Sequence, residues 1–148
     1  MTNNIIAGVA GSLAQEFGCP VYQNDVAQGL TPPCFLISLL SPSRKPYLGT
    51  RQRYDVPLDV LYFPEEAGNN RTLTDVADRL FETLAWVDLP DGDRLRGMDV
   101  HFEIQDQVLH FFVVYTLFLR QNIVLPYMED LKTDVIPEKG GEANGTES

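Results

Sequence analysis

The first hydrophobic pattern along the chain has the spacing of a helix. Apolar residues recur every four positions near the start, which places them on one face of an amphipathic helix. They are Ile5, Val9, Leu13 and Phe17. We expect Thr2, Asn3 or Asn4 to cap the start of this helix, and Gly18 followed by Pro20 is typical of its end.

A second helical pattern lies near the middle of the chain. Thr72 and Asp75 resemble a capping box at its start. One helical face is apolar and consists of Leu73, Val76, Ala77, Leu80, Phe81, Leu84 and Val87. The opposite face is mostly acidic and consists of Asp75, Asp78, Arg79 and Glu82. The pattern therefore predicts a helix that packs on one side and meets solvent on the other.

The segments between these helices predict two strands and a loop. Cys34–Leu40 is a continuous apolar run of strand length, and Tyr54–Tyr62 alternates between apolar and polar residues. Pro57 cannot donate a ladder hydrogen bond, which favours an edge strand or a bulge at that point. The Pro, Ser and Gly residues of Ser41–Arg53 predict a loop.

After the second helix the period changes to that of a hairpin. Met98, Val100, Phe102 and Ile104 alternate with polar residues, and Asp106 with Gln107 is expected to turn the chain back. The returning strand, Val108–Arg120, is apolar on both faces. Such a strand is typical of a sheet covered on each side, or of an interface between subunits.

The order helix, strands, helix, strands predicts one α+β domain over residues 1–132. We expect a mostly antiparallel sheet with the two main helices packed on one face of it. Tyr127–Lys132 is expected to form a short helical turn. Residues 133–148 are rich in Gly, Glu, Asn and Ser, which predicts a disordered acidic tail.

Composition narrows the function classes. The net charge is −10, so direct binding to duplex nucleic acid is not expected, because such binding depends on basic residues that release counterions from phosphates. No apolar stretch is long enough to cross a membrane, and the N-terminus lacks the features of a signal peptide. We therefore expect a protein of the cytoplasm in the cell that makes it.

No motif in the sequence predicts catalysis. The signatures of nucleophilic hydrolases, phosphate-binding loops, zinc proteases and dinucleotide-binding folds are all missing, so we expect no enzyme, no cofactor and no metal. Cys19 and Cys34 are interpreted as reduced thiols, with a disulfide as the alternative. His101 shares a strand face with Asp99 and Glu103, and His110 lies among apolar residues; both are interpreted as structural.

One loop reverses the charge of its surroundings. Four of the chain's 11 basic residues fall within ten positions, and tyrosines are interleaved with them. The cluster consists of Arg44, Lys45, Tyr47, Arg51, Arg53 and Tyr54. A solvated loop, a contact with nucleic acid, and a docking loop for an acidic patch on a neighbouring protein are all compatible with it.

Three segments together resemble the phage tail terminator family. The first is Val21–Leu40, with VY, QGL and PCF; the second is Tyr54–Leu84, with LYFP and VADRLFETL. The third is Arg96–Leu131, with HFEI, VLHFFVVY and PYMEDL. Each motif is a set of packing and turn residues, and their order and spacing carry the resemblance.

The resemblance implies a structural protein of a phage or prophage. Such a protein caps the tail tube as a homo-oligomeric ring, usually a hexamer, ends polymerisation of the major tail protein and prepares the surface for the head connector. It implies a place in the virion tail, a channel through which DNA passes without specific binding, and no catalytic residues. In such a ring we expect Arg51 or Arg53 to meet Asp75 or Asp78 of the next subunit.

Two other functions are compatible with the sequence. A head–tail joining or minor capsid protein would share the small α+β subunit and ring formation but bind the portal or connector. A small ligand-binding or regulatory domain would be a monomer or dimer whose melting temperature shifts with a metabolite.

Overall fold

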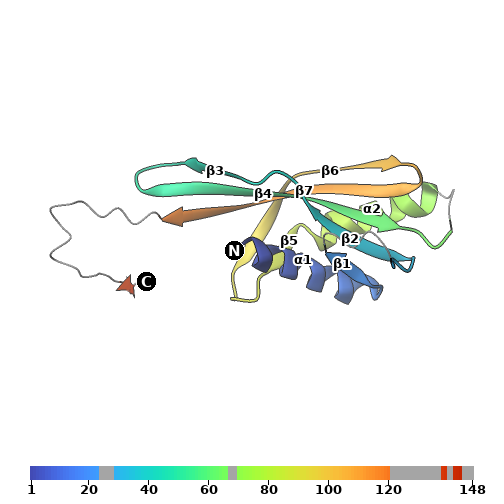
Figure 1. The fold of residues 1–148 in the computed structure, drawn as a ribbon, viewed down its shortest axis with the longest axis horizontal. Helices are drawn as coiled ribbons and strands as arrows, with labels where there is room; N and C mark the ends of the chain where they lie inside the picture. The colour runs from blue at the N-terminus through green and yellow to red at the C-terminus, as the bar shows by residue number, and fades with distance from the viewer. Residues whose placement is uncertain (24–28, 67–69, 121–137, 140–141, 145–148) are drawn as a thin grey trace.

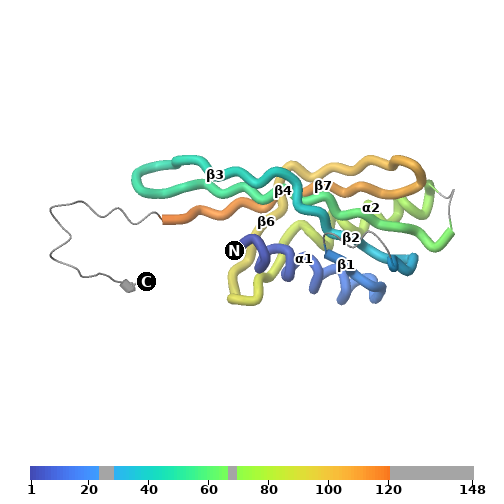
Figure 2. The backbone as a smooth tube through the Cα atoms, viewed as in Figure 1, coloured from blue at the N-terminus to red at the C-terminus, as the bar shows by residue number. Residues whose placement is uncertain are grey.

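In the computed structural model of the protein, a curled seven-stranded sheet carries both helices on one side (Figures 1 and 2). The structure describes residues 1–23, 29–66, 70–120, 138–139 and 142–144. The helices are α1 (Thr2–Phe17) and α2 (Asn70–Thr83). The strands of the sheet are β1 (Val21–Gln23), β2 (Cys34–Leu39), β3 (Ser43–Pro46), β4 (Arg51–Phe63), β5 (Trp86–Asp88), β6 (Arg94–Gln105) and β7 (Val108–Arg120).

The sheet has the order β1-β2-β4-β7-β6-β5, and β3 pairs with the beginning of β4. Every pairing within this seven-stranded sheet is antiparallel except that of β1 with β2, which is parallel. The expected α+β fold with a mostly antiparallel sheet is therefore confirmed. Two short segments, β8 (Glu138–Lys139) and β9 (Glu142–Asn144), pair with each other. The rest of residues 133–148 and the expected turn at Tyr127–Lys132 lie outside the described residues, so both remain predictions.

Helix α1 ends where the pattern predicts but starts differently. Gly18 ends it in the left-handed conformation at φ 69°, and its N–H donates to Ala14 O at 3.0 Å. The expected side-chain cap is wrong: the helix begins at Thr2 directly after Met1, and no side chain caps it. The Thr2 hydroxyl instead shares a hydrogen bond with the Tyr54 hydroxyl of β4. Packing against the sheet, and not capping, thus positions the start of α1.

Helix α2 begins and ends earlier than the pattern predicts. It already includes Asn70, so Thr72 is inside the helix and the capping-box interpretation is wrong. Val87 belongs to β5 and not to the helix. The chain leaves the helix after Thr83 because the next backbone groups pair with the sheet: Gly97 N–H donates to Ala85 O at 2.8 Å.

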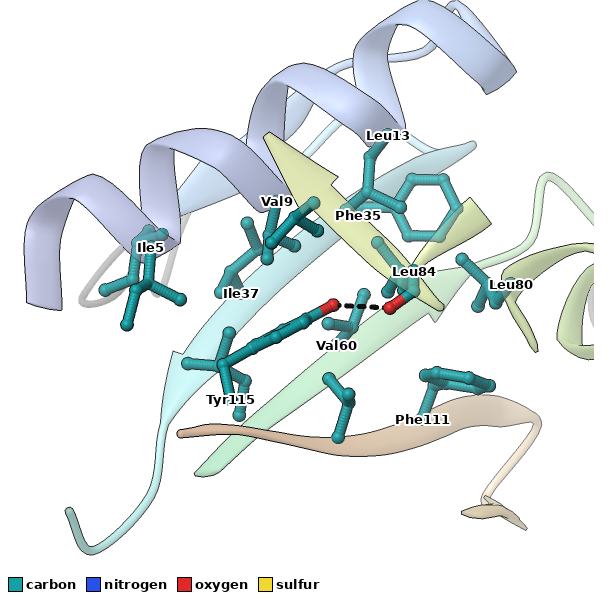
Figure 3. Close-up of a cluster of buried hydrophobic side chains, with 14 of the residues drawn as sticks. Ile5, Val9, Leu13, Phe35, Ile37, Val60, Leu80, Leu84, Phe111 and Tyr115 are labelled. Carbon is teal, nitrogen blue, oxygen red and sulfur yellow. Dashed lines mark hydrogen bonds between the residues drawn. The ribbon is translucent and has the colours of Figure 1, made fainter. Parts of the chain in front are cut away.

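The hydrophobic core lies between the helices and one face of the sheet (Figure 3). Ile5, Val9 and Leu13 of α1 point toward Phe35 and Ile37 of β2. Tyr115 of β7 is fully buried in this layer. Its hydroxyl donates to Leu84 O at 2.7 Å, directly after α2, so the residue ties the end of the helix to the centre of the sheet.

A bulge in β6 places Met98 on the sheet face opposite to the predicted one. Met98 pairs with Val114 and His101 with Phe112, so β6 has one extra residue between these pairs. Asp99 takes a left-handed conformation at φ 52° in this bulge. Met98 was expected on the apolar face of its strand, but the bulge changes the alternation and leaves 49% of it exposed. The turn at Asp106 and Gln107, with φ 51° and 65°, is confirmed.

Pro57 does not mark an edge, because β4 lies between β2 and β7. Its carbonyl accepts a hydrogen bond from Leu40 N–H at 3.0 Å. In a strand, the N–H and C=O of one residue point to the same side. The nitrogen of Pro57, which has no hydrogen to donate, therefore faces the gap between β2 and β3. Its lack of an N–H removes no hydrogen bond between β4 and β7. The register confirms a bulge there: Leu39 pairs with Leu58 and Ser43 with Asp55, so one residue is extra.

The predicted loop Ser41–Arg53 is a hairpin. β3 pairs with residues 52–55 of β4, and the tight turn between them is closed by Arg51 N–H donating to Leu48 O at 3.1 Å. Gly49 adopts φ 62° in this turn. Pro46 is compatible with β3 because Tyr47 N–H faces β4, which directs the nitrogen of Pro46 to the free edge. Turn-forming residues thus predicted a loop where neighbouring strands impose pairing.

Candidate assembly surface

The hairpin is part of a three-stranded arm that projects beyond the helices. We define the arm as residues 43–55, which contain β3 and the beginning of β4, together with residues 116–120 at the end of β7. The pairing of Arg51 with Arg120 and of Asp55 with Thr116 joins the two parts. The arm extends to the left in Figure 1, while α2 lies at the opposite end of the sheet. The arm is therefore an exposed extension of the subunit.

Exposed aromatic and aliphatic side chains cover the arm. Tyr47 and Phe118 form an aromatic pair with ring centroids 4.8 Å apart, although 44% and 52% of these residues are exposed. Leu48 at the tip is 71% exposed. The guanidinium of Arg44 lies 4.8 Å from the ring of Tyr54 on the other face of the arm. Aromatic residues beside arginine are typical of the residues that dominate protein interfaces.

The arm separates charge within the subunit. It contains Arg44, Lys45, Arg51, Arg53 and Arg120 against a single acid, Asp55, so its charge is 5 − 1 = +4. The rest of the chain has six basic and twenty acidic residues, which gives 6 − 20 = −14. An interface between the arm and another part of the same protein would therefore be attractive.

The predicted interface residues form two groups, which lie at opposite ends of the subunit. The basic group and Tyr47 lie together on the arm. Asp75 and Asp78 are exposed on α2, far from the arm of the same chain. A contact between the two groups therefore requires a second subunit, as the prediction supposes. Phe118 and Arg120 belong to the arm as well, and only the doubly apolar pattern of their strand pointed to them.

A layer of polar and charged side chains lies on the sheet face that the helices leave uncovered, which we call the open face. Arg53 Nε donates to Asp55 Oδ1 at 3.0 Å, and the Thr116 hydroxyl donates to the same oxygen at 2.7 Å. Burial alone would raise the pKa of Asp55, but these two partners outweigh it and hold the pKa below its usual value. The carboxylate thus anchors the base of the arm.

Asp59 and His110 form a second pair on the open face. His110 Nδ1 lies 2.9 Å from Asp59 Oδ2, while the other carboxylate oxygen is buried without a partner among the described residues. Burial raises the pKa of Asp59 above its usual value, and His110 opposes this shift. The interpretation of His110 as a structural histidine with a satisfied ring nitrogen is consistent with this contact.

Replacing His110 with alanine should lower the free energy of unfolding, because the buried carboxylate of Asp59 loses its partner. Leaving a buried polar group without its partner costs about 1–3 kcal/mol of unfolding free energy. When folding raises the pKa of a group, its protonated form stabilises the folded state. This stability is lost as the pH rises from the pKa of the unfolded state through the pKa of the folded state. The loss in His110→Ala should therefore be larger at pH 7 than at pH 4, as measured by urea unfolding.

A double variant is the control for that measurement. Asp59→Val combined with His110→Ala removes the carboxylate together with its partner, so it should be more stable at pH 7 than His110→Ala alone. A loss in the single variant that is the same at both pH values would contradict the role of the carboxylate.

His101, Cys19 and Cys34 are the remaining candidates for a chemical role. His101 stacks on Phe112 with ring centroids 4.7 Å apart. Cys19 and Cys34 are free thiols, and burial raises the pKa of both. Among the described residues, no three His, Cys, Asp or Glu side chains are placed to hold a metal ion. The helices that the structure describes are too short or too polar to cross a membrane.

These features define a structural subunit, with a sheet, a helical layer on one side and a charged arm. The model of the phage tail terminator protein family matches residues 4–124, and the chain belongs to this family. It is therefore a structural component of a phage tail and not an enzyme. A search of curated protein sequences found no match. Among the solved structures that match, one chain is 15% identical, with a TM-score of 0.42; the alignment covers 84% of this chain and 99% of that chain.

Proposed function

We propose that this protein caps the tail tube as a homo-oligomeric ring, most simply a hexamer. In this role it ends polymerisation of the major tail tube protein and presents the surface to which the head connector binds. The protein would assemble in the host cytoplasm and remain in the virion tail. The observation that carries the proposal, beyond the family, is the basic aromatic arm on a subunit that is otherwise acidic.

Charge separation of this kind favours head-to-tail contacts. When one surface patch binds a different patch on an identical neighbour, repetition of the contact closes a ring if the rotation permits. The arm supplies Arg51 and Arg53, and α2 supplies the exposed carboxylates of Asp75 and Asp78. Because the two groups lie at opposite ends of the subunit, each copy can use both at once.

The acidic remainder of the chain suits a channel for DNA. Phosphates are repelled by a wall of carboxylates, so a genome can pass without binding to it. In the ring the basic arm would be neutralised by its neighbour, which leaves the acidic surface to face the channel. This account uses the charge of the chain without requiring specific contacts to DNA.

Light scattering over a range of protein concentrations tests the ring. We expect a hexamer, or a monomer that becomes one as concentration rises. Arg51→Glu with Arg53→Glu should raise the dissociation constant at least tenfold, and adding Asp75→Arg with Asp78→Arg should restore assembly. The control is Arg94→Glu with Arg96→Glu, which changes the net charge by the same amount as Arg51→Glu with Arg53→Glu. Both control residues lie beside Trp86, away from the arm.

If light scattering finds only a monomer at every concentration, the protein is then mixed with purified major tail tube protein. Binding at the tube end with six copies per tube would support capping by assembly on the tube. No binding to the tube, but binding to purified portal or connector, would instead identify a head–tail joining protein.

A further inference from the structure

The open face carries an apolar row halfway along its strands. We call it the central row; it consists of Leu40, Pro57, Val114 and Met98. Met98 pairs with Val114, Val114 with Pro57, and Leu40 bonds to Pro57, so the four residues cross the sheet as neighbours. Leu40 and Met98 are 41% and 49% exposed. No described element covers this row.

The central row divides the open face into two halves of opposite charge. Val114 is the middle residue of β7, and Pro57 is the middle residue of β4, because six residues of each strand lie on either side. Alternation along the strands places four cations on the arm half of the face, namely Lys45, Arg51, Arg53 and Arg120, against the single carboxylate of Asp55. The other half has Asp59 and Glu103 and neither lysine nor arginine.

We infer that the open face is self-complementary and packs against the open face of a second copy of this chain. A two-fold axis along the central row reverses the strand direction of the second copy. It places the cationic half of each copy on the acidic half of the other and brings the two central rows together. Sheets that pack face to face keep their strands within about 30° of each other, which this arrangement permits.

The area of the face is close to that of a standard protein–protein interface. β7 has 13 residues, and at about 3.4 Å per residue and about 4.8 Å between strands the open face covers roughly 700 Å². A standard interface buries about 800 Å² on each partner. Aromatic contacts add to the charge pattern, because the axis places Phe118 of one copy over the row of His110 in the other.

The pairing goes beyond the proposed ring. A ring needs contacts between different patches, whereas the central row would contact its own symmetry mate. The structure therefore assigns a second self-contact. Because it uses Arg51 and Arg53, which the ring contact also uses, it would join two free subunits and not subunits that are already in a ring.

Cysteine cross-linking tests the position of the axis. In Val114→Cys and in Met98→Cys the new thiol lies on the axis, opposite its own copy across sheets that are about 10 Å apart. A short bismaleimide of that span should convert either variant to a covalent dimer. Gln105→Cys is the matched control: it is on the same face but six pairs or more from the axis, about 40 Å from its copy. The unmodified protein controls for Cys19 and Cys34.

Two outcomes decide the inference. Cross-linking of Val114→Cys and Met98→Cys but not of Gln105→Cys would support it. Folded variants, judged by circular dichroism, that do not cross-link at the central row, or that cross-link equally at Gln105→Cys, would overturn it. A ring without this cross-link leaves the proposed function intact, and a cross-linked dimer that never forms a ring leaves only the pairing.

Discussion

Replacing Tyr115 with alanine is expected to lower the free energy of unfolding by about 3–5 kcal/mol. The ring is fully buried between the sheet and the helical layer, and its hydroxyl donates to Leu84 O at 2.7 Å. Alanine would leave a cavity and also remove the partner of that carbonyl. Urea unfolding followed by circular dichroism measures the change.

Tyr115→Phe separates the two contributions. The ring stays and only the hydrogen bond is lost, so the expected cost is about 1–3 kcal/mol. A phenylalanine variant as stable as the unmodified protein would show that Leu84 O finds another partner. An alanine variant that loses less than the phenylalanine variant would contradict the placement of the ring in the core.

Replacing Gly97 with alanine is expected to cost about 1–3 kcal/mol, although alanine adds only one methyl group. An added Cβ would lie 2.7 Å from Leu84 O and 2.8 Å from Val113 Cγ2. The carbonyl belongs to the backbone at the end of α2, so it cannot move without displacing the helix. Thermal unfolding of the variant should show a lower melting temperature.

Gly11→Ala is the matched control for this substitution. Nothing lies within 4 Å of an added Cβ at Gly11, which is in the exposed part of α1. Alanine in a helix interior is favoured over glycine by about 1 kcal/mol, so this variant should be more stable. Opposite signs for the two variants are the expected result, and a stabilising Gly97→Ala would contradict the close approach of α2 to β6.

Local pattern was sufficient where one period persisted over many residues. The four-residue repeat of α1 and the alternation of Tyr54–Tyr62 predicted a helix and a strand that the structure confirms. Predictions were wrong where the position of a residue in the sheet depended on its pairing partner, which the local pattern does not show. Pro57 suggests an edge in isolation, but its position opposite Leu40 makes it compatible with a central strand.

The basic cluster illustrates the same limit for the candidate assembly surface. The sequence shows Arg44, Lys45, Arg51 and Arg53 close together. It does not show that β7 extends beside them and adds Phe118 and Arg120, because that pairing joins residues more than sixty positions apart. The pair of Asp59 and His110 was hidden for the same reason.

The sequence by itself determined the α+β class, the positions of the main helices and strands, the acidic character and the resemblance to the tail terminator family. These follow from local periodicity, composition and short motifs, each of which is contained in one stretch of chain. Only the tertiary structure decided which sheet face the helices cover, that the expected loop is an arm, and that cations and carboxylates occupy opposite halves of the open face. Those features depend on the register between distant strands, which no single segment encodes.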